Sequence, residues 1–287
     1  MQEPRIGFIG QGFIGKNYAD DFEQRGLHVV RYAQETAFIA NKETIAECDI
    51  IFIAVPTPTT PNGFDLSIVE SVIPLTKIGA TVVVKSTISP GSTEHLTEMF
   101  PDRFIMHSPE FLREASAAED AAHPERNIIG IPKDTAEYRE RAEAVLAVLP
   151  KVPFSRIVSA RAAELVKYAG NNFLYLKVVY ANMLFDLSES LGIKYDDVAE
   201  MLAADSRIGP SHLSVVHASG HTTQTGRGAG GHCFIKDFEA FRRLYAAKVN
   251  DSAGDALLNA LKDKNNALLR GSGKDLDLLD QVYGPLS

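Results

Sequence analysis

Short, uninterrupted apolar runs recur through the first half of the chain, and each has the length of one strand. Strands that are buried on both faces of a parallel sheet show this pattern, whereas half-exposed strands alternate apolar and polar residues. The predicted strands are Arg5–Gly10, Leu27–Tyr32, Ile50–Val55, Ala80–Lys85, Arg103–His107 and Asn127–Gly130, with Val152–Phe154 as an edge strand. Helical spacing separates them, most clearly at Lys16–Arg25 and Asp134–Leu149. This alternation predicts an α/β domain with a doubly wound parallel sheet.

The pattern changes near Ser159. One long helix is predicted over Ala160–Leu191, ended by Gly192. Further helices follow, interrupted by the glycine-rich segment Ser219–Gly231, and the tail Gly271–Ser287 is expected to be a loosely attached extension. We therefore expect an α/β domain over residues 1–158 and, over residues 159–287, a long connecting helix with a smaller all-helical domain.

Composition narrows the class of protein. A chain of 287 residues, of which 45% are apolar, is long enough for two domains with their own cores. The net charge of −8, without blocks of like charge, argues against nucleic acid or an anionic membrane as a partner held by charge. Two cysteines, Cys48 and Cys233, form no disulfide framework. With no signal-peptide pattern and no membrane-length apolar run, the expected location is the cytoplasm.

A glycine-rich turn joins the first strand to the first helix. Its sequence is Gly10, Gln11, Gly12, Phe13, Ile14, Gly15, which is G-x-G-x-x-G between a strand and a helix. In that context the glycines allow a tight turn, close approach of a pyrophosphate and close helix–strand packing. The helix N-terminus adds free amides and a positive dipole end. The sequence thus predicts a Rossmann-type dinucleotide-binding domain.

One expected residue of that domain is missing. The second strand normally ends in an acidic residue that holds the ribose hydroxyls. Here Ala33 follows Tyr32, and the first carboxylate is Glu35, two positions late. A dinucleotide is expected, and the choice between NAD and NADP stays open at this point.

The segment Gly228–Asp237, GAGGHCFIKD, holds a cysteine in a glycine-rich turn. A nearby Lys236 can favour the thiolate of Cys233, and Asp237 is a carboxylate available for proton transfer or for holding the lysine. Cys233 as a nucleophile and Cys233 as a small buried apolar residue are both open from spacing alone.

Lys167 and Asn171 lie four residues apart on the long helix and therefore share a face. An ammonium beside an amide can stabilise a developing alkoxide, although a surface lysine beside a polar residue gives the same spacing. Four histidines, His212, His217, His221 and His232, lack regular ligand spacing, so no metal site is expected.

Several segments together resemble one family, the UDP-glucose/GDP-mannose dehydrogenases, and within it the UDP-glucose 6-dehydrogenases. The matching stretches are GQGFIG at Gly10, AVPTP at Ala54, KSTISPGS at Lys85, SPEFLREA at Ser108, AELVKYAGNNF at Ala163, DSRIG at Asp205 and GAGGHCFIKD at Gly228. They occur in the order of the family and spread over most of the chain. The resemblance implies a two-step, NAD-dependent oxidation of a primary alcohol to a carboxylate, UDP-glucose to UDP-glucuronate being the expected case.

The resemblance also implies roles for individual residues. Cys233 is similar to the nucleophile that forms a thiohemiacetal and then a thioester, Lys167 and Asn171 to the pair that stabilises oxyanions, and Asp237 and Glu110 to acid/base groups. Thr87 resembles a residue that orients water and nicotinamide. The implied cofactor contacts are Gly10, Gln11, Gly12, Phe13, Ile14, Gly15, Val55, Thr57, Thr87, Glu114 and Lys236. The implied substrate contacts are Glu110, Phe111, Leu112, Lys167, Asn171, Arg207, Gly230 and Cys233, with Arg207 reaching the substrate of a neighbouring subunit, which implies a homodimer.

The sequence departs from the family at several points. A third domain that grips the nucleotide is expected in the family and does not follow here, Ala229 replaces an aromatic residue, and the segment between DSRIG and the cysteine is about ten residues longer, which suggests a lid or loop insertion. Two alternatives stay open. One is a β-hydroxyacid dehydrogenase of the 6-phosphogluconate-dehydrogenase type, which also has a Lys-x-x-x-Asn pair. The other is a shortened homologue without catalytic activity.

Overall fold

The structure, a computed structural model, describes residues 3–285, which divide into two compact units. The first unit contains the chain up to Pro58 together with Asp65–Lys167. The second contains Thr59–Phe64 and the chain from Tyr168 onward. Each unit is described by itself below.

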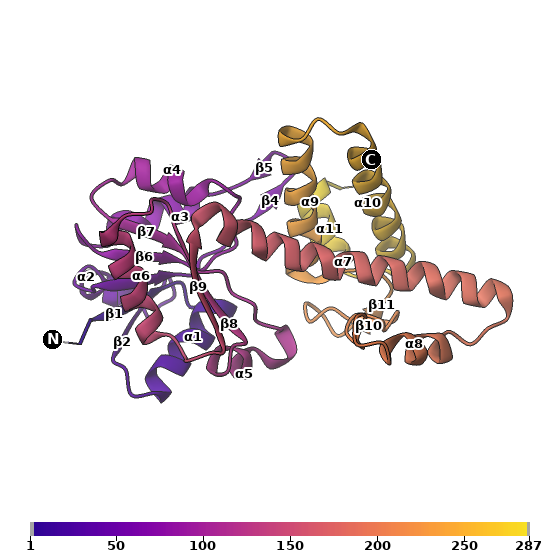
Figure 1. Cartoon of the computed structure of the whole chain (residues 1–287), viewed down its shortest axis with the longest axis horizontal. Coiled ribbons are helices and arrows are strands. Elements are labelled where there is room, and N and C mark those ends of the chain that lie inside the picture. The colour runs from indigo at the N-terminus through magenta and orange to yellow at the C-terminus, as the bar shows by residue number, and fades with distance from the viewer. Residues whose placement is uncertain (1–2, 286–287) are drawn as a thin grey trace. The chain divides into compact units, whose positions relative to one another are not determined.

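A seven-stranded sheet forms the centre of the first unit (Figure 1). Its strands are β1 (Ile6–Ile9), β2 (Val29–Tyr32), β3 (Ile50–Ile53), β6 (Thr81–Val84), β7 (Phe104–His107), β8 (Arg126–Ile131) and β9 (Phe154–Ser159). They lie in the order β2-β1-β3-β6-β7-β8-β9. The first five strands pair in parallel, β8 pairs antiparallel with β7, and β9 pairs in parallel with β8. The predicted α/β fold is confirmed, with a mixed sheet in place of a wholly parallel one.

The central strands account for the uninterrupted apolar runs in the sequence. Every residue of β1, β3 and β6 is buried, as expected for strands covered on both faces. Phe8 and Phe52 stack at 4.9 Å between ring centroids, and Phe22 from helix α1 meets Phe8 edge-on at 5.2 Å. These rings fill the core between the sheet and α1.

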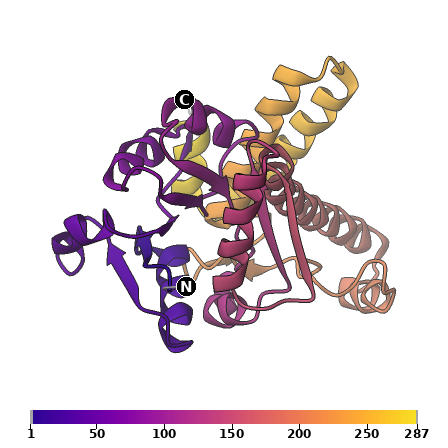
Figure 2. The same ribbon diagram turned by 60° about the vertical axis from the view of Figure 1, so that its left-hand side comes forward.

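The helices of this unit connect the strands. They are α1 (Phe13–Gln24), α2 (Lys42–Ile45), α3 (Ser67–Val72), α4 (Ser92–Met99), α5 (Ala117–Ala122) and α6 (Ala136–Val148), with short 3-10 turns at η1 (Ile39–Asn41), η2 (Ile73–Leu75) and η3 (Glu114–Ser116). Helix α6 packs on β8 and β9 (Figure 2). Strand β9 is the predicted edge strand, but it begins only at Phe154, where the predicted strand ended. The prediction missed its extent because this strand is mostly exposed and has no apolar run.

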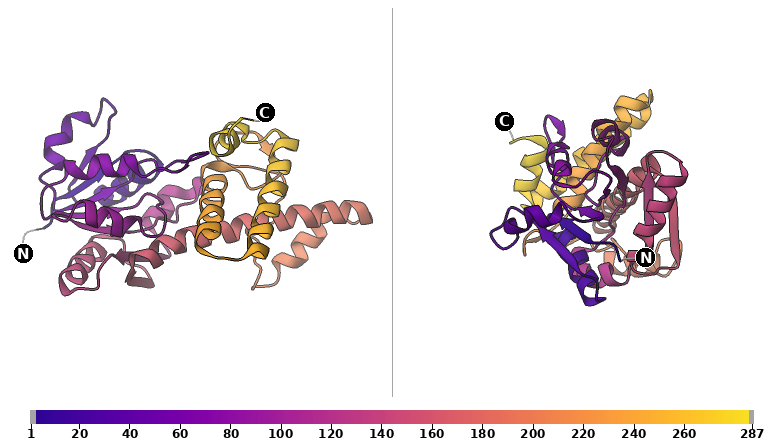
Figure 3. Two further views of the ribbon diagram at one scale, coloured as in Figure 1. Left: turned by 90° about the horizontal axis from the view of Figure 1, so that it is seen from above. Right: turned by 90° about the vertical axis from the view of Figure 1, so that its left-hand side faces the viewer.

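Helix α7 (Ala160–Leu191) has the predicted bounds and continues from the first unit into the second. The second unit also contains α8 (Tyr195–Ala203), α9 (Gly231–Lys248), α10 (Ser252–Ser272) and α11 (Leu276–Tyr283). Helices α9 and α10 run side by side (Figure 3). Tyr175 of α7 and Phe238 of α9 stack at 4.0 Å in its core.

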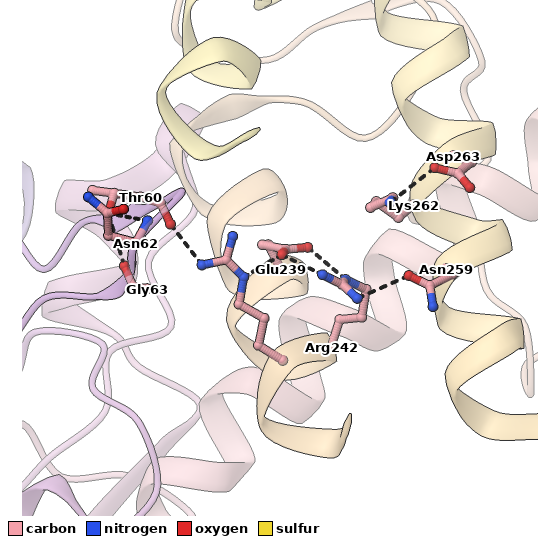
Figure 4. A network of polar contacts seen from close by, with 9 residues as sticks. Thr60, Asn62, Gly63, Glu239, Arg242, Asn259, Lys262 and Asp263 are labelled. Atoms are coloured by element: carbon pink, nitrogen blue, oxygen red, sulfur yellow. Dashed lines mark hydrogen bonds and ion pairs between the residues drawn. The ribbon is translucent and has the colours of Figure 1, made fainter. Parts of the chain in front are cut away.

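The sequence predicts an all-helical second domain, but the second unit also contains strands. It holds two small antiparallel ladders, β4 (Thr59–Thr60) with β5 (Gly63–Phe64) and β10 (His217–Ala218) with β11 (Thr225–Gly226). Arg243 of α9 donates from Nη1 to the Thr60 carbonyl at 2.8 Å, and the buried Glu239 carboxylate holds Arg243 and Arg242 (Figure 4). This network anchors the first ladder to α9.

The prediction of a loosely attached tail is wrong for the described residues. Lys274 and Asp275 are buried, and α11 buries Leu278, Leu279 and Val282 against α9 and α10. The sequence signal for this helix is an apolar residue at every third or fourth position. Because α11 has only eight residues, this pattern is too short to distinguish it from a polar extension. Residues 286 and 287 lie outside the described part. Within residues 3–285, no helix combines the length and apolar character that crossing a bilayer requires.

Candidate functional site

The glycine turn after β1 has the backbone of a dinucleotide site. Gly10 has a φ of +93°, and a Cβ there would lie 2.3 Å from the Ala54 carbonyl oxygen. A Cβ on Gly15 would lie 1.9 Å from the Gly10 carbonyl oxygen, so helix α1 approaches the turn as closely as glycine permits. A Cβ on Gly12 would meet no atom within 4 Å. The first and last glycines therefore serve packing, and Gly12 leaves open the space where a pyrophosphate would approach.

The turn lies where the order of the strands reverses. From β1 the chain passes to β2 on one side and then to β3 on the other, and ligands bind at the carboxyl ends of strands at such a point. Two hydrogen bonds join the loops that follow β3 and β6. The Thr57 hydroxyl donates to the Thr87 carbonyl at 2.7 Å, and the Ser86 hydroxyl donates to the Val55 carbonyl at 2.7 Å. Thr57 and Thr87 are buried, so these predicted cofactor residues line the carboxyl edge of the sheet.

The end of β2 carries no carboxylate at the ribose position. Glu35 is exposed and lies in the turn after the strand. Arg31 is held by Asp20 and Glu23, and its Nη1 also lies 3.3 Å from Oε1 of the buried Gln11. The predicted cofactor residue Gln11 is thus fixed by an arginine that has carboxylate partners of its own.

A buried ion pair connects two of the predicted catalytic residues. Lys167 Nζ of α7 lies 2.6 Å from Glu110 Oε1, and their side chains are 5% and 4% exposed. The other carboxylate oxygen of Glu110 accepts from the Leu112 amide at 2.7 Å. The loop after β7 is therefore folded around Glu110, and the Lys167 ammonium faces a carboxylate in a site from which water is excluded.

Two further titratable groups lie beside this pair and were not identified from the sequence. Lys85, at the end of β6, is buried, and its Nζ lies 3.2 Å from the Ser108 hydroxyl and 4.1 Å from the centre of the Tyr18 ring. Burial lowers the pKa of Lys85 to about 7, although Glu110 opposes the shift. Burial, aided by Lys85, lowers the pKa of His107 to about 3, so this imidazole is neutral. Lys85 stands first in the KSTISPGS stretch, but no pattern separates it from a surface lysine.

The remaining predicted residues of this loop have mixed environments. Phe111 is covered by the Arg126 guanidinium at 3.8 Å from its ring centre, and Leu112 packs on the core. Glu114 begins η3 and is exposed. The first unit thus contains the glycine turn, Thr87, Glu110 and Lys167.

The second unit holds the cysteine and its neighbours. Cys233 is half-buried in the first turn of α9, and Asp237, one turn further on, is almost fully buried. Asp237 accepts from Asn171 Nδ2 at 2.6 Å and pairs with Lys236 Nζ at 2.5 Å. Asn171 lies one turn after Lys167 on α7, as predicted.

The charge of Lys236 is stabilised by this arrangement. Burial disfavours its ammonium, but the charges of Asp237, Cys233 and Tyr168 outweigh burial and raise the pKa of Lys236. A cation therefore lies beside the thiol, the setting that favours a thiolate. Lys236, predicted as a cofactor contact, is bound here to Asp237. By contrast, Cys48 is fully buried, and burial raises its pKa to about 11.

The structure also places the last predicted substrate residues and the histidines. Gly230 precedes α9, and Arg207 is exposed with its guanidinium bound to Asp205 at 2.6 Å. His221 contacts His232 at 3.0 Å and Asp277 at 2.7 Å. No cluster of three or more metal-ligating side chains is found among residues 3–285.

Comparison with known proteins identifies two family domains along the chain. Residues 32–149 match the NAD-binding domain of the UDP-glucose/GDP-mannose dehydrogenase family, and residues 161–267 match its central domain. The glycine turn lies before the first matched segment. Enzymes of this family use NAD, so NAD is the cofactor of the first unit.

Individual relatives agree with these matches. UDP-glucose 6-dehydrogenase of Rhizobium meliloti is 37% identical over 68% of this chain and 46% of its own length. UDP-glucose 6-dehydrogenase AglM of Haloferax volcanii is 31% identical over 98% of this chain and 76% of its own. The solved structure of a UDP-glucose dehydrogenase from Pyrobaculum islandicum superimposes with a TM-score of 0.78 at 28% identity, over 99% of this chain and 72% of that one. The chain spans about half the length of most curated relatives that it matches.

Proposed function

Because the chain belongs to the UDP-glucose/GDP-mannose dehydrogenase family, we propose that it oxidises the primary alcohol of a nucleotide sugar to a carboxylate in two NAD-dependent steps. UDP-glucose, which would give UDP-glucuronate, is the first candidate substrate, since the relatives above are named for it. We further propose that the product is used in polysaccharide synthesis and that the enzyme acts in the cytoplasm, a reducing compartment in which a catalytic thiol stays free.

One observation carries the proposal. Cys233 lies in the first turn of α9, and one turn further on are a cation, Lys236, and a buried carboxylate, Asp237, to which Asn171 is hydrogen-bonded. A thiol that only fills space needs neither a buried cation nor a buried carboxylate near it.

The first oxidation makes an aldehyde. Bound NAD⁺ supplies a hydride acceptor for each oxidation. The alcohol proton passes to the Glu110 carboxylate, which is suited as the base because it is buried beside the Lys167 ammonium. Lys167 and Asn171, one turn apart on α7, stabilise the developing oxyanion.

The second oxidation proceeds through a covalent intermediate. Cys233 Sγ adds to the aldehyde carbon while the thiol proton passes to the aldehyde oxygen, which gives a thiohemiacetal. This intermediate then loses a hydride and its hydroxyl proton and becomes a thioester. Water then adds to the thioester carbon, with Asp237 as its base, and the C–S bond breaks to release the carboxylate and the thiol. In sum, one alcohol, two NAD⁺ and one water give one carboxylate, two NADH and three protons.

A substitution at the cysteine tests this role. Cys233→Ser should abolish carboxylate formation while the dissociation constant for NAD stays unchanged, because a serine hydroxyl is a poorer nucleophile at neutral pH. Cys48→Ala is the matched control and should keep its activity. Wild-type turnover by Cys233→Ser would rule out the covalent route.

We also propose a homodimer formed through α7. From Phe173 to its end, this helix carries an exposed apolar stripe at helical spacing, consisting of Phe173, Leu176, Tyr180, Met183, Leu187 and Leu191. Four of these six side chains are more than half exposed in the single chain, which is unusual for residues of this size on one helix face. The exposed Arg207 would then be available to the substrate of the other subunit.

A further inference from the structure

The tail residues Lys274 and Asp275 make buried contacts with the segment that precedes the cysteine. Asp275 Oδ2 accepts from the Gly231 amide at 2.9 Å, and Gly231 is the first residue of α9. Lys274 Nζ lies 3.1 Å from the Gly228 carbonyl oxygen and 3.5 Å from that of Gly226. The tail therefore contacts both amides and carbonyls of the glycine-rich turn, and both of its side chains are buried.

This contact requires an unusual backbone conformation in the tail and a glycine in the turn. Asp275 has a φ of 53°, a left-handed conformation in which aspartate and asparagine are the most common residues after glycine. A Cβ on Gly230 would lie 2.0 Å from Asp275 Oδ2, so the carboxylate reaches the turn only because Gly230 has no side chain. The contact between the Asp275 carboxylate and the turn thus depends on a left-handed backbone at Asp275 and on a glycine at position 230.

The contact lies at the end of the helix that carries the thiol. A helix begins with amides that have no partner within the helix, and the residue before α9, Gly230, supplies no side-chain cap. Asp275, which belongs to a distant segment, caps the amide of Gly231. Gly231 lies two residues before Cys233. The other oxygen of Asp275 accepts from the Ser219 hydroxyl at 2.9 Å, which ties the preceding loop to the same carboxylate.

We propose that Asp275 is a positioning residue for Cys233, fixing the first turn of α9 so that the thiol keeps one geometry of attack. The proposal rests on the role of Cys233 proposed above. Asp275 acts through the Gly231 amide, to which its Oδ2 is hydrogen-bonded. A displacement of the nucleophile by about 1 Å can slow its attack about 100-fold. Fraying of this turn would therefore lower kcat, while the glycine turn that binds NAD in the first unit would be unaffected.

Two variants separate the hydrogen bond from the charge. Asp275→Gly removes the acceptor and avoids backbone strain at this left-handed position. Asp275→Asn keeps an oxygen for the Gly231 amide, and its NH₂ group can donate to the Ser219 hydroxyl, which can also accept. Asp280→Asn, on the exposed side of α11, is the matched control for loss of a charge.

The expected kinetic result is a split between kcat and the cofactor constants. Asp275→Gly should lower kcat roughly tenfold or more, with the KM for NAD unchanged. Asp275→Asn and Asp280→Asn should stay within about threefold of the wild type. Equal loss in both Asp275 variants, or no loss in Asp275→Gly, would overturn the proposal.

Alkylation with iodoacetamide provides a readout that needs no substrate. In Asp275→Gly, the half-buried Cys233 should react several times faster than in the wild type, while the fully buried Cys48 stays unreactive. Mass spectrometry of the two cysteine peptides distinguishes them. Faster reaction of both cysteines would indicate a general structural role and would overturn the proposal, as would an unchanged rate at Cys233. If the wild type forms no carboxylate, the proposed function fails, and the alkylation result still decides whether Asp275 positions Cys233.

Discussion

Glu110 and Lys167 form an ion pair with almost no exposure to water, and beside them the buried Lys85 ammonium is hydrogen-bonded to Ser108. Removing two charges from water is costly, and such a pair is kept for what it does more often than for stability. The buried charges of the first unit therefore cost stability, and we attribute their presence to the chemistry of the site.

Breaking this pair should be costly. Glu110→Gln leaves the Lys167 ammonium buried without its carboxylate, and the free energy of unfolding should fall by about 3 kcal/mol. The double variant Glu110→Gln with Lys167→Met should recover much of that loss and remain inactive. Urea denaturation of both variants measures this. Equal stability of Glu110→Gln and the wild type would contradict the buried pair.

The buried Lys85 predicts a pH dependence of stability. Its pKa is lowered to about 7 in the folded state, below the ordinary value of 10.5, so the folded chain binds fewer protons than the unfolded chain between these values. The contribution of Lys85 to stability therefore rises as pH increases from about 7 toward 10.5. Lys274, with a pKa lowered to about 8 by burial, contributes with the same sign.

The difference between the wild type and Lys85→Met isolates this effect. The advantage of Lys85→Met over the wild type in urea midpoint should be larger at pH 7 than at pH 9. A difference that does not change with pH would mean that Lys85 keeps its ordinary pKa.

Among the elements, the glycine turn gives the clearest contrast between packing and ligand binding. Gly15→Ala places a Cβ 1.9 Å from a backbone oxygen and should lower the melting temperature strongly. Gly12→Ala meets no atom and should leave the melting temperature within a few degrees, yet weaken NAD binding tenfold or more, because the added methyl group occupies the approach of the pyrophosphate. Thermal unfolding and calorimetric titration with NAD test the pair. Unchanged NAD affinity in Gly12→Ala would place the cofactor elsewhere.

The elements also show how far the sequence alone predicts this fold. Strands β1, β3 and β6 were predicted because burial on both faces leaves continuous apolar runs, and α7 because its helical pattern has no proline and ends at Gly192. The extent of strand β9 and the packing of the tail were not predicted, because β9 is mostly exposed and the tail is held by contacts with distant segments. The tail depends on Gly228 and Gly231, more than 40 residues away.

The candidate site divides in the same way. Cys233, Asp237, Lys167, Asn171 and Glu110 stand in stretches that resemble the family, so their types and order were available from the sequence. Lys85, His107 and Asp275 were not identified as site residues, although Lys85 stands in such a stretch, because what distinguishes them is burial and contacts between distant segments.

At the scale of the whole molecule, the apolar stripe on α7 predicts the oligomeric state. The wild type should sediment as a dimer at micromolar concentration, and Leu187→Glu, within the stripe, should give a monomer because a carboxylate would be buried without a partner. Glu189→Gln, on the same helix outside the stripe, is the control. A monomeric wild type with full activity would contradict both the dimer and the role of Arg207 across it.

In the proposed reaction, one alcohol group is oxidised twice on one chain. The number of NADH molecules formed for each UDP-glucose consumed tests this, with the product identified by mass spectrometry. We expect two NADH and a carboxylate, since the thioester on Cys233 makes the second hydride transfer possible. One NADH for each alcohol consumed, with a carbonyl compound as the final product, is the result of a hydroxyacid-type reaction and would contradict it.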